Sequence, residues 1–389
     1  MIRPSILVAP GRGWGGGLPL WPGSPEITVM RNRRYALRLV EKIPKGALSI
    51  GAKSVDVSAL ELLLCCGLLS GPATSFADRR IWSFYIEHVG SLCHAPSSLT
   101  LRMSDDTRNW DSHQKRGFSD RLGMGVAGWA LWQHYGVEHI ADAEPFISRA
   151  LASMKGTKFH GAWLKRMSKD RLKPDFFCLD SSGEAVVAEA KGRIGAAGTV
   201  ANAIVHGKKQ VAAVTPQGVT LRAHGGRLVL GTNLRLRGDN PGNGHDSGLT
   251  VVDPEGDEPL AVEVSADEIA RHSYANLFAF LGYGDLAAGL REGVGFRWPR
   301  GVIEESSLSL PYFPRLRVIP LLHLGDWMIG IDAGVALELF GAQRQEERLV
   351  TRLRPELARF GELRGEGGEP TETATTFVNG WGAFRMDTG

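Results

Sequence analysis

Three ionisable residues near the middle of the chain have the types and spacing of a metal-dependent hydrolytic site. Asp175 follows Pro174, and Glu189-Ala190-Lys191 comes after thirteen intervening residues. Carboxylate oxygens are the ligands that Mg²⁺ prefers, and this ion keeps several waters for the reaction. A lysine beside such an ion can orient the attacking water and offset the negative charge of a phosphate. The pattern therefore predicts metal-assisted hydrolysis of a phosphodiester, with Asp175 and Glu189 as metal ligands and Lys191 as a catalytic cation.

The elements that carry these residues must bring them together. Two apolar runs lie on either side of the turn sequence 180–183 (Asp-Ser-Ser-Gly), which predicts a β-hairpin. Antiparallel pairing over this turn places Asp175 opposite Glu189. Because side chains alternate along a strand, Glu189 and Lys191 are expected on the same face, while Ala190 turns inward. The main-chain carbonyl of Ala190 is then available as a further oxygen ligand.

Helices are expected before and after this hairpin. Apolar residues at helical spacing predict a helix over 119–135, which Ser119 could cap. Its small residues Gly123, Gly125 and Gly128 would let another backbone approach closely, so we expect this helix to pack hard against a sheet. A second helix is expected over 199–214, and a further strand over 227–234.

The motif and the order of these elements resemble the PD-(D/E)XK nuclease superfamily, the fold of many restriction endonucleases and Holliday-junction resolvases. The resemblance runs from Ser119 to Leu234 and says nothing of the flanks. It implies an α/β protein with a restriction-endonuclease-like core, in which a mixed β-sheet is flanked by helices. It also implies Mg²⁺ or Mn²⁺ as cofactor. Many members carry a Gln or Lys on the helix after the motif, which implies a catalytic role for Gln210, beside Lys208 and Lys209.

The chain departs from the family at one metal ligand. Members often carry a Glu on the helix that precedes the sheet, and residues 119–135 contain none. Asp120 is the only acid in that segment and is therefore the candidate for a third metal-binding carboxylate. The missing Glu favours the alternative that the chain is a non-catalytic member, which binds nucleic acid or scaffolds a larger complex.

A basic segment leads into the motif. Between Lys155 and Lys173 lie seven Lys or Arg residues against the single acid Asp170, whereas the whole chain carries a net charge of only +3. Each cation that neutralises a phosphate releases counterions and so promotes binding. The residues expected to bind nucleic acid are Lys165, Arg166, Lys169, Arg171, Lys173, Lys208 and Lys209. A solvated helix face accounts for the same composition equally well.

The bulk composition is that of an ordinary globular protein with two or three domains. The chain has 389 residues, of which 43% are hydrophobic and 22% charged. We expect an N-terminal accessory unit over 1–110, a nuclease domain over 111–255 and a C-terminal accessory or partner-binding unit over 256–389. Both flanking units should be α+β, and the tail from residue 364 onward should be flexible.

Several classes of function are not expected. The longest apolar run is too short to span a bilayer, and the N-terminus has no signal-peptide pattern. The four cysteines form neither a disulfide framework nor a zinc-binding pattern, so a cytoplasmic location without a membrane partner is expected. The glycine-rich run 11–17 lacks the Gly-Lys-Ser/Thr of a phosphate-binding loop, which argues against ATP hydrolysis.

Taken together, the residues and the resemblance predict a Mg²⁺-dependent nuclease that hydrolyses DNA, with RNA as the alternative substrate. Restriction or antiphage defence is the leading biological role, by analogy with the fold, and DNA repair or recombination is the nearest rival. An ATPase or helicase subunit and a second copy of this chain are the candidate protein partners.

Overall fold

The computed structural model describes most of the chain. The described residues are 34–42, 53–70, 90–96, 98–169, 172–195, 198–239, 247–254, 259–293, 300–310, 313–324, 327–340, 348–366, 374–376 and 379–385. Two of the cations expected to bind nucleic acid lie outside this description, namely Arg171 and the side chain of Lys169.

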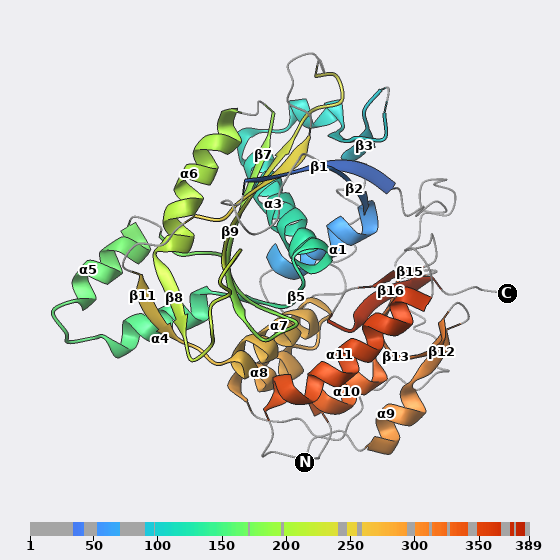
Figure 1. Ribbon diagram of the computed structural model, residues 1–389. Coiled ribbons are helices and arrows are strands. Elements are labelled where there is room, and N and C mark those ends of the chain that lie inside the picture. Colours follow the sequence, from blue (N-terminus) through green and yellow to red (C-terminus); the bar gives the residue numbers. More distant parts are fainter. Residues whose placement is uncertain are drawn as a thin grey trace.

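A seven-stranded mixed sheet forms the centre of the molecule (Figure 1). In spatial order its strands are β2 (Lys53–Ser58), β1 (Arg34–Lys42), β10 (Gly248–Val252), β9 (Arg227–Leu234), β7 (Ala185–Ile194), β6 (Phe176–Asp180) and β5 (Val137–Asp142). β1 runs parallel to β10, and β7 runs parallel to β9. The other neighbouring pairs are antiparallel. The expected α/β class with a large mixed sheet is confirmed.

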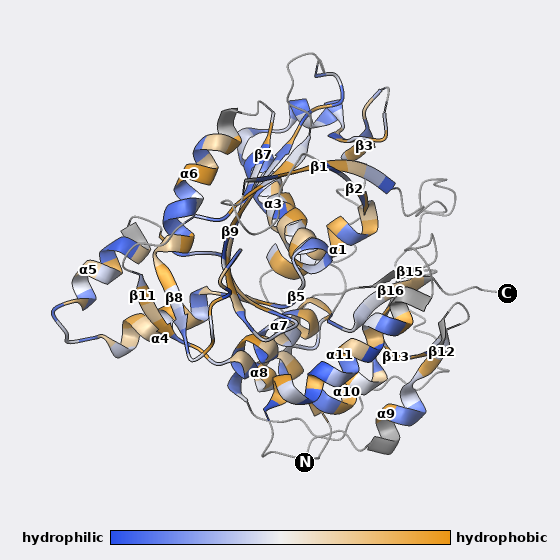
Figure 2. Cartoon of the chain, in the orientation of Figure 1, coloured by the Kyte–Doolittle hydropathy of each residue, from blue (hydrophilic) through white to orange (hydrophobic). Residues whose placement is uncertain are grey.

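Helices cover both faces of this sheet. On one face α1 (Ala59–Ser70) packs against α3 (Ser112–His134), and α3 in turn lies on β7. On the other face α6 (Gly198–Ala212) lies across β7 and β9. Side chains of β7 point alternately to the two faces. Ala188 and Ala190 belong to the core under α1 and α3, whereas Val187 belongs to the core under α6. Figure 2 shows hydrophobic and hydrophilic residues alternating along α6, as expected for a helix with one face on a sheet.

Three glycines explain how α3 comes so close to its neighbours. A Cβ atom on Gly123 would lie 2.5 Å from the main-chain nitrogen of Gly192 in β7. A Cβ atom on Gly125 would meet Cys66 of α1, and one on Gly128 would meet Leu69. The prediction of a helix packed hard against a sheet is therefore confirmed, and α3 is wedged between that sheet and α1.

The start of α3 differs from the prediction. Asp111 is the N-terminal cap, since its carboxylate accepts hydrogen bonds from the N–H groups of His113 and Gln114. The Gln114 side chain accepts in return from the N–H of Asp111, which completes a capping box. The helix thus begins seven residues before Ser119, which lies inside it, so the prediction that Ser119 caps the helix is wrong.

Two strands from the described residues before 111 belong to the central sheet. β1 and β2 complete the central sheet, because β1 pairs with β10 from Arg38 and Gly248 to Lys42 and Val252. A small ribbon of β3 (Leu92–His94) and β4 (Leu101–Met103) follows, and then the 3₁₀ helix Asp105–Asn109. The unit expected over 1–110 therefore contributes directly to the sheet that carries the motif.

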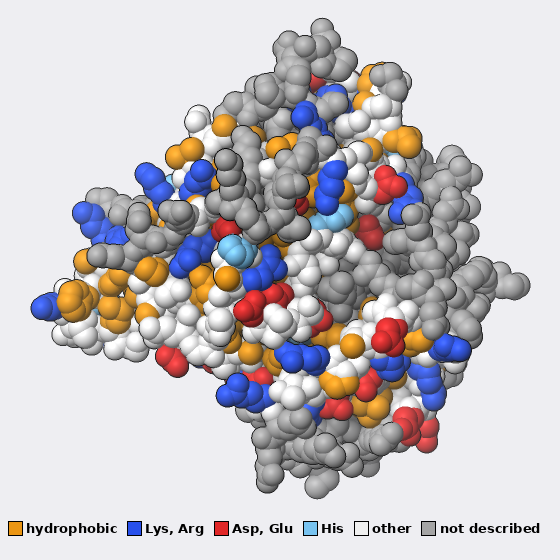
Figure 3. All heavy atoms as spheres, viewed as in Figure 1, with side chains coloured by type: hydrophobic (Ala, Val, Ile, Leu, Met, Phe, Trp, Pro, Cys, Tyr) orange, Lys and Arg blue, Asp and Glu red, His pale blue; other side chains and the backbone are white. Residues whose placement is uncertain are grey.

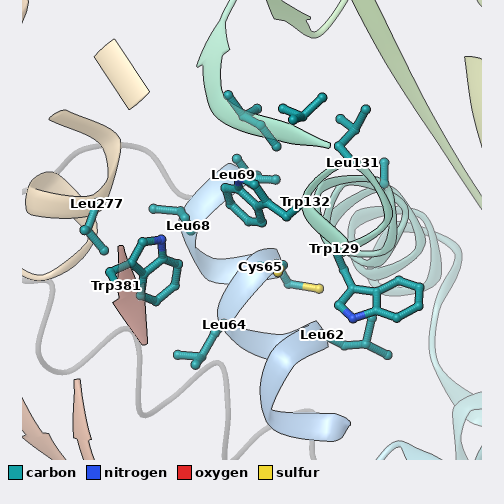
Figure 4. Packing of buried hydrophobic residues seen from close by; sticks show 14 of the residues in the cluster. Leu62, Leu64, Cys65, Leu68, Leu69, Trp129, Leu131, Trp132, Leu277 and Trp381 are labelled. Atoms are coloured by element: carbon teal, nitrogen blue, oxygen red, sulfur yellow. The ribbon is translucent and has the colours of Figure 1, made fainter. Parts of the chain in front are cut away.

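The C-terminal part contains a second sheet and several helices. Its five strands, in spatial order, are β12 (Leu308–Leu310), β13 (Phe313–Leu324), β14 (Trp327–Asp332), β16 (Trp381–Arg385) and β15 (Ala374–Thr376). Its helices are α7 (Ala266–Phe280), α8 (Gly284–Glu292), α9 (Arg300–Ser306), α10 (Ala333–Phe340) and α11 (Leu349–Glu366). For the described residues 374–376 and 379–385 the expectation of a flexible tail is wrong. Trp381 of β16 is fully buried, near Leu68 and Leu277 (Figure 4), and its ring meets that of Trp132.

A smaller layer lies beside α6. It consists of α4 (Glu144–Ser153), α5 (His160–Leu164), the π-helix Lys165–Lys169 and the parallel pair β8 (Val214–Gln217) and β11 (Leu260–Glu263). Among the helices that the structure describes, none combines the length and the apolar character needed to cross a bilayer.

Candidate active site at the open edge of β7

β6 and β7 form the hairpin that the sequence predicts. Phe176 pairs with Ala188, and Leu179 pairs with Ala185. In the turn, the Asp180 carboxylate accepts hydrogen bonds from the main chain, and Gly183 adopts φ 83°, a conformation that glycine takes without strain. This register places Asp175, directly before β6, beside the residue that follows Ala188.

Asp175 and Glu189 are tied to each other through the main chain. The N–H of Asp175 donates to Oε2 of Glu189 over 2.8 Å, and the N–H of Ala190 donates to Oδ2 of Asp175 over 2.9 Å. Glu189 is fully buried, and Asp175 is half-buried. Nζ of Lys191 pairs with Oε1 of Glu189, so these two side chains share a face as predicted. The hairpin therefore brings all three residues of the motif to one point.

Burial raises the pKa of both carboxyl groups. For Asp175 the loss of solvent is the main cause, and the charge of Lys191 and the N–H of Ala190 partly oppose it. For Glu189 the loss of solvent and then the charge of Asp175 hold the pKa well above its usual range. Two close carboxylates thus share one cation, Lys191, and a divalent ion would supply the missing positive charge.

The oxygen atoms at this point suit a hard cation. The N–H and C=O of one strand residue leave the strand on the same edge, so the Ala190 carbonyl is on the edge where its N–H meets Asp175. Two carboxylates and one carbonyl are ligands that Mg²⁺ and Mn²⁺ favour, with water completing the shell. Within the described residues, no three His, Cys, Asp or Glu side chains form a group that could hold a metal ion. The protein would therefore supply Asp175, Glu189 and Ala190.

Asp120, the candidate third carboxylate, has other partners. Its Oδ1 lies 3.5 Å from a guanidinium nitrogen of Arg193, and its Oδ2 lies 4.0 Å from Nε of Arg116. It lines the same cavity as Asp175 but forms ion pairs with arginines instead of joining the carboxylates of the hairpin.

A cavity of ≈ 910 Å³ opens in front of the motif. Its walls are two helices on opposite faces of the sheet, and its floor is the end of β7. The lining residues are Ser112, Lys115, Arg116, Ser119, Asp120 and Met124 of α3, Asn202, Ala203, His206 and Gln210 of α6, Ala190, Lys191, Arg193 and Ile194 of β7, and Asp175. The residues from α3 recur every three or four positions, so one face of that helix forms the wall.

Gln210 lies on α6 where the resemblance implies a site residue. Its Nε2 donates to the carbonyl of Lys173 over 2.7 Å, directly ahead of the Pro174-Asp175 pair. Its Oε1 is buried and has no hydrogen-bond partner, although the side chain is only 7% exposed. Gln210 therefore anchors the chain that enters the hairpin, and it is one of the residues that line the cavity.

The cations that the sequence singled out lie elsewhere. Lys173 pairs with the carboxylate of Glu144 at 2.8 Å, and the Arg166 guanidinium lies over the ring of Trp163. Lys165, Lys208 and Lys209 are exposed, and none of these five lines the cavity. Figure 3 shows Lys and Arg side chains along the side of the molecule that α5 and α6 form.

The cations that do line the cavity, besides Lys191, escaped the sequence analysis. They are Lys115 and Arg116 of α3 and Arg193 of β7, with His206 of α6 beside them. One signal was available for Arg193, because it lies two residues after Lys191 on the predicted strand and so shares its face. The α3 residues lie far from the motif in sequence and carry no such signal.

The arrangement is suited to holding a divalent cation and a phosphate side by side. The carboxylates of Asp175 and Glu189 would provide the cation site, and four cations around the cavity, Lys115, Arg116, Lys191 and Arg193, favour an anionic ligand. Comparison with family models, curated proteins and solved structures yields no match for this chain.

Proposed function

We propose that this protein is a metal-dependent nuclease that hydrolyses phosphodiester bonds of DNA at Asp175, Glu189 and Lys191. The observation that carries the proposal is their convergence. The β6–β7 hairpin brings two carboxylates and a lysine to one point, at the floor of a cavity lined with cations. The resemblance to PD-(D/E)XK nucleases implied such a hairpin, a mixed sheet between helices and a Gln on the following helix. Each of these is present, which supports the proposal.

The chain's own groups have distinct tasks in this proposal. Asp175, Glu189 and the Ala190 carbonyl hold the ion. Bound Mg²⁺ or Mn²⁺ would lower the pKa of a water molecule and place positive charge beside the phosphate. Once the Glu189 carboxylate serves as a ligand, the Lys191 ammonium needs another anion, and a phosphate oxygen in the cavity provides one. Lys191 would thereby position the phosphodiester and stabilise the charge that develops on it.

A cleavage assay tests this proposal. The purified protein is incubated with plasmid, linear and single-stranded DNA and with RNA, in Mg²⁺, in Mn²⁺ or in EDTA. We expect cleavage only with a divalent ion, and loss of cleavage in Asp175→Asn and in Lys191→Ala. Arg348→Ala is the control, because Arg348 is exposed and lies outside the cavity. Equal cleavage by the wild type and by both site variants would show that the active site lies elsewhere.

A non-catalytic nucleic-acid-binding or scaffold subunit is the second candidate. The observation that favours it is the ion pairing of Asp120 with Arg116 and Arg193, which leaves the hairpin with two carboxylates. On this alternative the protein binds nucleic acid with a steep dependence on salt and cuts nothing under any ion. Restriction or antiphage defence, with an ATPase or helicase partner, remains the role that we propose for the nuclease by analogy with the fold.

A further inference from the structure

The cavity lies where one strand of the sheet ends early. β6 pairs with β7 only as far as Ala188, whereas β9 pairs with the opposite edge of β7 through Ile194. Among the described strands, none pairs with this edge of β7 beyond Ala188, and the N–H of Ala190 on that edge donates to Asp175. Beyond Ala188 this edge of β7 faces the cavity between α3 and α6, whose lining includes Ala190, Lys191, Arg193 and Ile194.

Two arginines from different elements lie together on one side of this space. Asp120 of α3 holds them, with Arg193 at 3.5 Å and Arg116 at 4.0 Å. Arg193 also donates to the carbonyl of Gly192 over 2.7 Å, which fixes its guanidinium near the end of β7. The ion pairs are partly exposed, with side-chain exposures of 39% for Arg193 and 75% for Arg116. Such pairs are weak, so both guanidinium groups can turn to a phosphate without a large loss of stability.

Apolar side chains line the same cavity. Met124 of α3, Ile194 of β7 and Ala203 of α6 contribute surface among the polar residues. Proteins that bind single-stranded nucleic acid combine cations for the backbone with side chains, typically aromatic, on which bases stack. In this cavity aliphatic side chains supply the apolar surface for the base faces. In an intact duplex the base faces are stacked on one another and cannot reach such a surface.

We propose that the cavity binds one unpaired nucleic-acid strand, with Arg116 and Arg193 as its phosphate subsite and Asp120 as the residue that positions them. This inference rests on the proposed nuclease function and narrows its substrate to single strands and unpaired ends. A sphere of ≈ 910 Å³ is about 12 Å across, which is about the width of the major groove of B-DNA alone. A duplex is wider than its own major groove, so a cavity of that size fits one strand better than two.

Binding measured without turnover tests the inference. Fluorescence anisotropy in EDTA gives the Kd of the full chain for a labelled single-stranded DNA, the same sequence as RNA and a blunt DNA duplex. We expect at least one of the single strands to bind about tenfold or more tightly than the duplex. The double variant Arg116→Ala/Arg193→Ala should raise the single-strand Kd by about tenfold, since two phosphate contacts are lost. Its melting temperature should stay that of the wild type.

Lys53→Ala/Arg348→Ala is the matched control, because it removes the same charge from two exposed positions outside the cavity. We expect it to change the single-strand Kd by less than about twofold. Equal binding of duplex and single strands overturns the inference, and so does a control that weakens binding as much as the arginine variant. Since these measurements are made in EDTA, their outcome is independent of cleavage. Loss of cleavage in Asp175→Asn tests the nuclease separately.

Discussion

Gly123 of α3 and Gly192 of β7 pack backbone against backbone. A Cβ atom on Gly123 would lie 2.5 Å from the nitrogen of Gly192, and a Cβ atom on Gly192 would overlap the carbonyl oxygen of Ser119. Gly192 directly follows Lys191, and Ser119 is next to Asp120 in the cavity wall. This contact therefore fixes the distance between α3 and the floor of the cavity. Only glycine at both positions lets the two elements approach so closely.

Replacing Gly192 with alanine should destabilise the protein and disturb the site. The added methyl group meets main-chain atoms, which cannot move aside as a flexible side chain can, so we expect a loss of about 1–3 kcal/mol in the free energy of unfolding. Urea denaturation measures this loss. Gly117→Ala is the control on α3, the helix that Gly192 contacts, since nothing lies within 4 Å of its Cβ position. Alanine there should stabilise the helix by about 0.5–1 kcal/mol. Equal free energies of unfolding for the two variants would contradict the close packing of Gly192 against α3.

Asp175→Asn should abolish cleavage without lowering stability in the absence of metal. Loss of an outer-shell residue of a metal site typically costs about 10–100-fold in activity, so we expect a larger loss for a ligand. Burial raises the pKa of Asp175, which means that its ionised form is unfavourable in the fold, and a neutral amide removes this cost. The rate of plasmid cleavage and the melting temperature in EDTA are measured together. A variant that is inactive but also unfolded would not support a ligand role.

Metal binding should strengthen as the pH rises and should release protons. The carboxyl groups of Asp175 and Glu189 have raised pKa values, so the metal-free site holds more protons at a given pH than ordinary carboxylates would. A cation binds only the ionised forms, and its affinity therefore falls as the pH is lowered through these pKa values. Titration calorimetry from about pH 6 to about pH 8, in buffers of different ionisation enthalpy, measures both effects. A binding heat that does not depend on the buffer would contradict the expected proton release.

The hairpin was predictable because its determinants are local. The turn residues 180–183, the apolar runs beside them and the alternation of Glu189, Ala190 and Lys191 all lie within twenty residues or so of one another. The close packing of α3 was predictable for a similar reason. Gly123, Gly125 and Gly128 each lower the stability of the helix, so their presence together indicates that another element packs closely against it. In both cases the short-range pattern already contains the physical cause.

The rest of the site depends on contacts between distant segments. Lys115 and Arg116 reach the cavity only because α3 lies against β7, and β1 completes the sheet by pairing with β10, about two hundred residues later. No periodicity within either segment specifies such a partner. In the C-terminal tail the sequence predicted flexibility where the structure has a strand. The polar, glycine-rich residues at the start of the tail suggested disorder, but β16 carries the buried Trp381. A residue that fills a core made by α1, α3 and α7 has no local signal of burial.

His139 should make the protein sensitive to acid. Its ring is 1% exposed beside Tyr274, and neither ring nitrogen has a hydrogen-bond partner. Burial lowers the pKa of His139 to about 4, whereas an exposed histidine titrates near its usual value of about 6.5. The unfolded chain therefore takes up a proton more readily than the folded protein. Stability is unaffected above about pH 6.5 and falls progressively as the pH drops toward about 4, by about 2 kcal/mol at pH 5.

His139→Leu should remove this part of the pH dependence, because leucine has no charge to desolvate and replaces a ring that makes no hydrogen bond. Urea denaturation of the wild type and the variant at pH 7 and pH 5 gives the difference. We expect the variant to gain about 2 kcal/mol relative to the wild type between the two pH values. Carboxyl groups that titrate in this range affect both proteins equally and cancel in the comparison. If the free energy of unfolding changes by the same amount between pH 7 and pH 5 in the wild type and the variant, the ring of His139 can take up a proton without leaving the core.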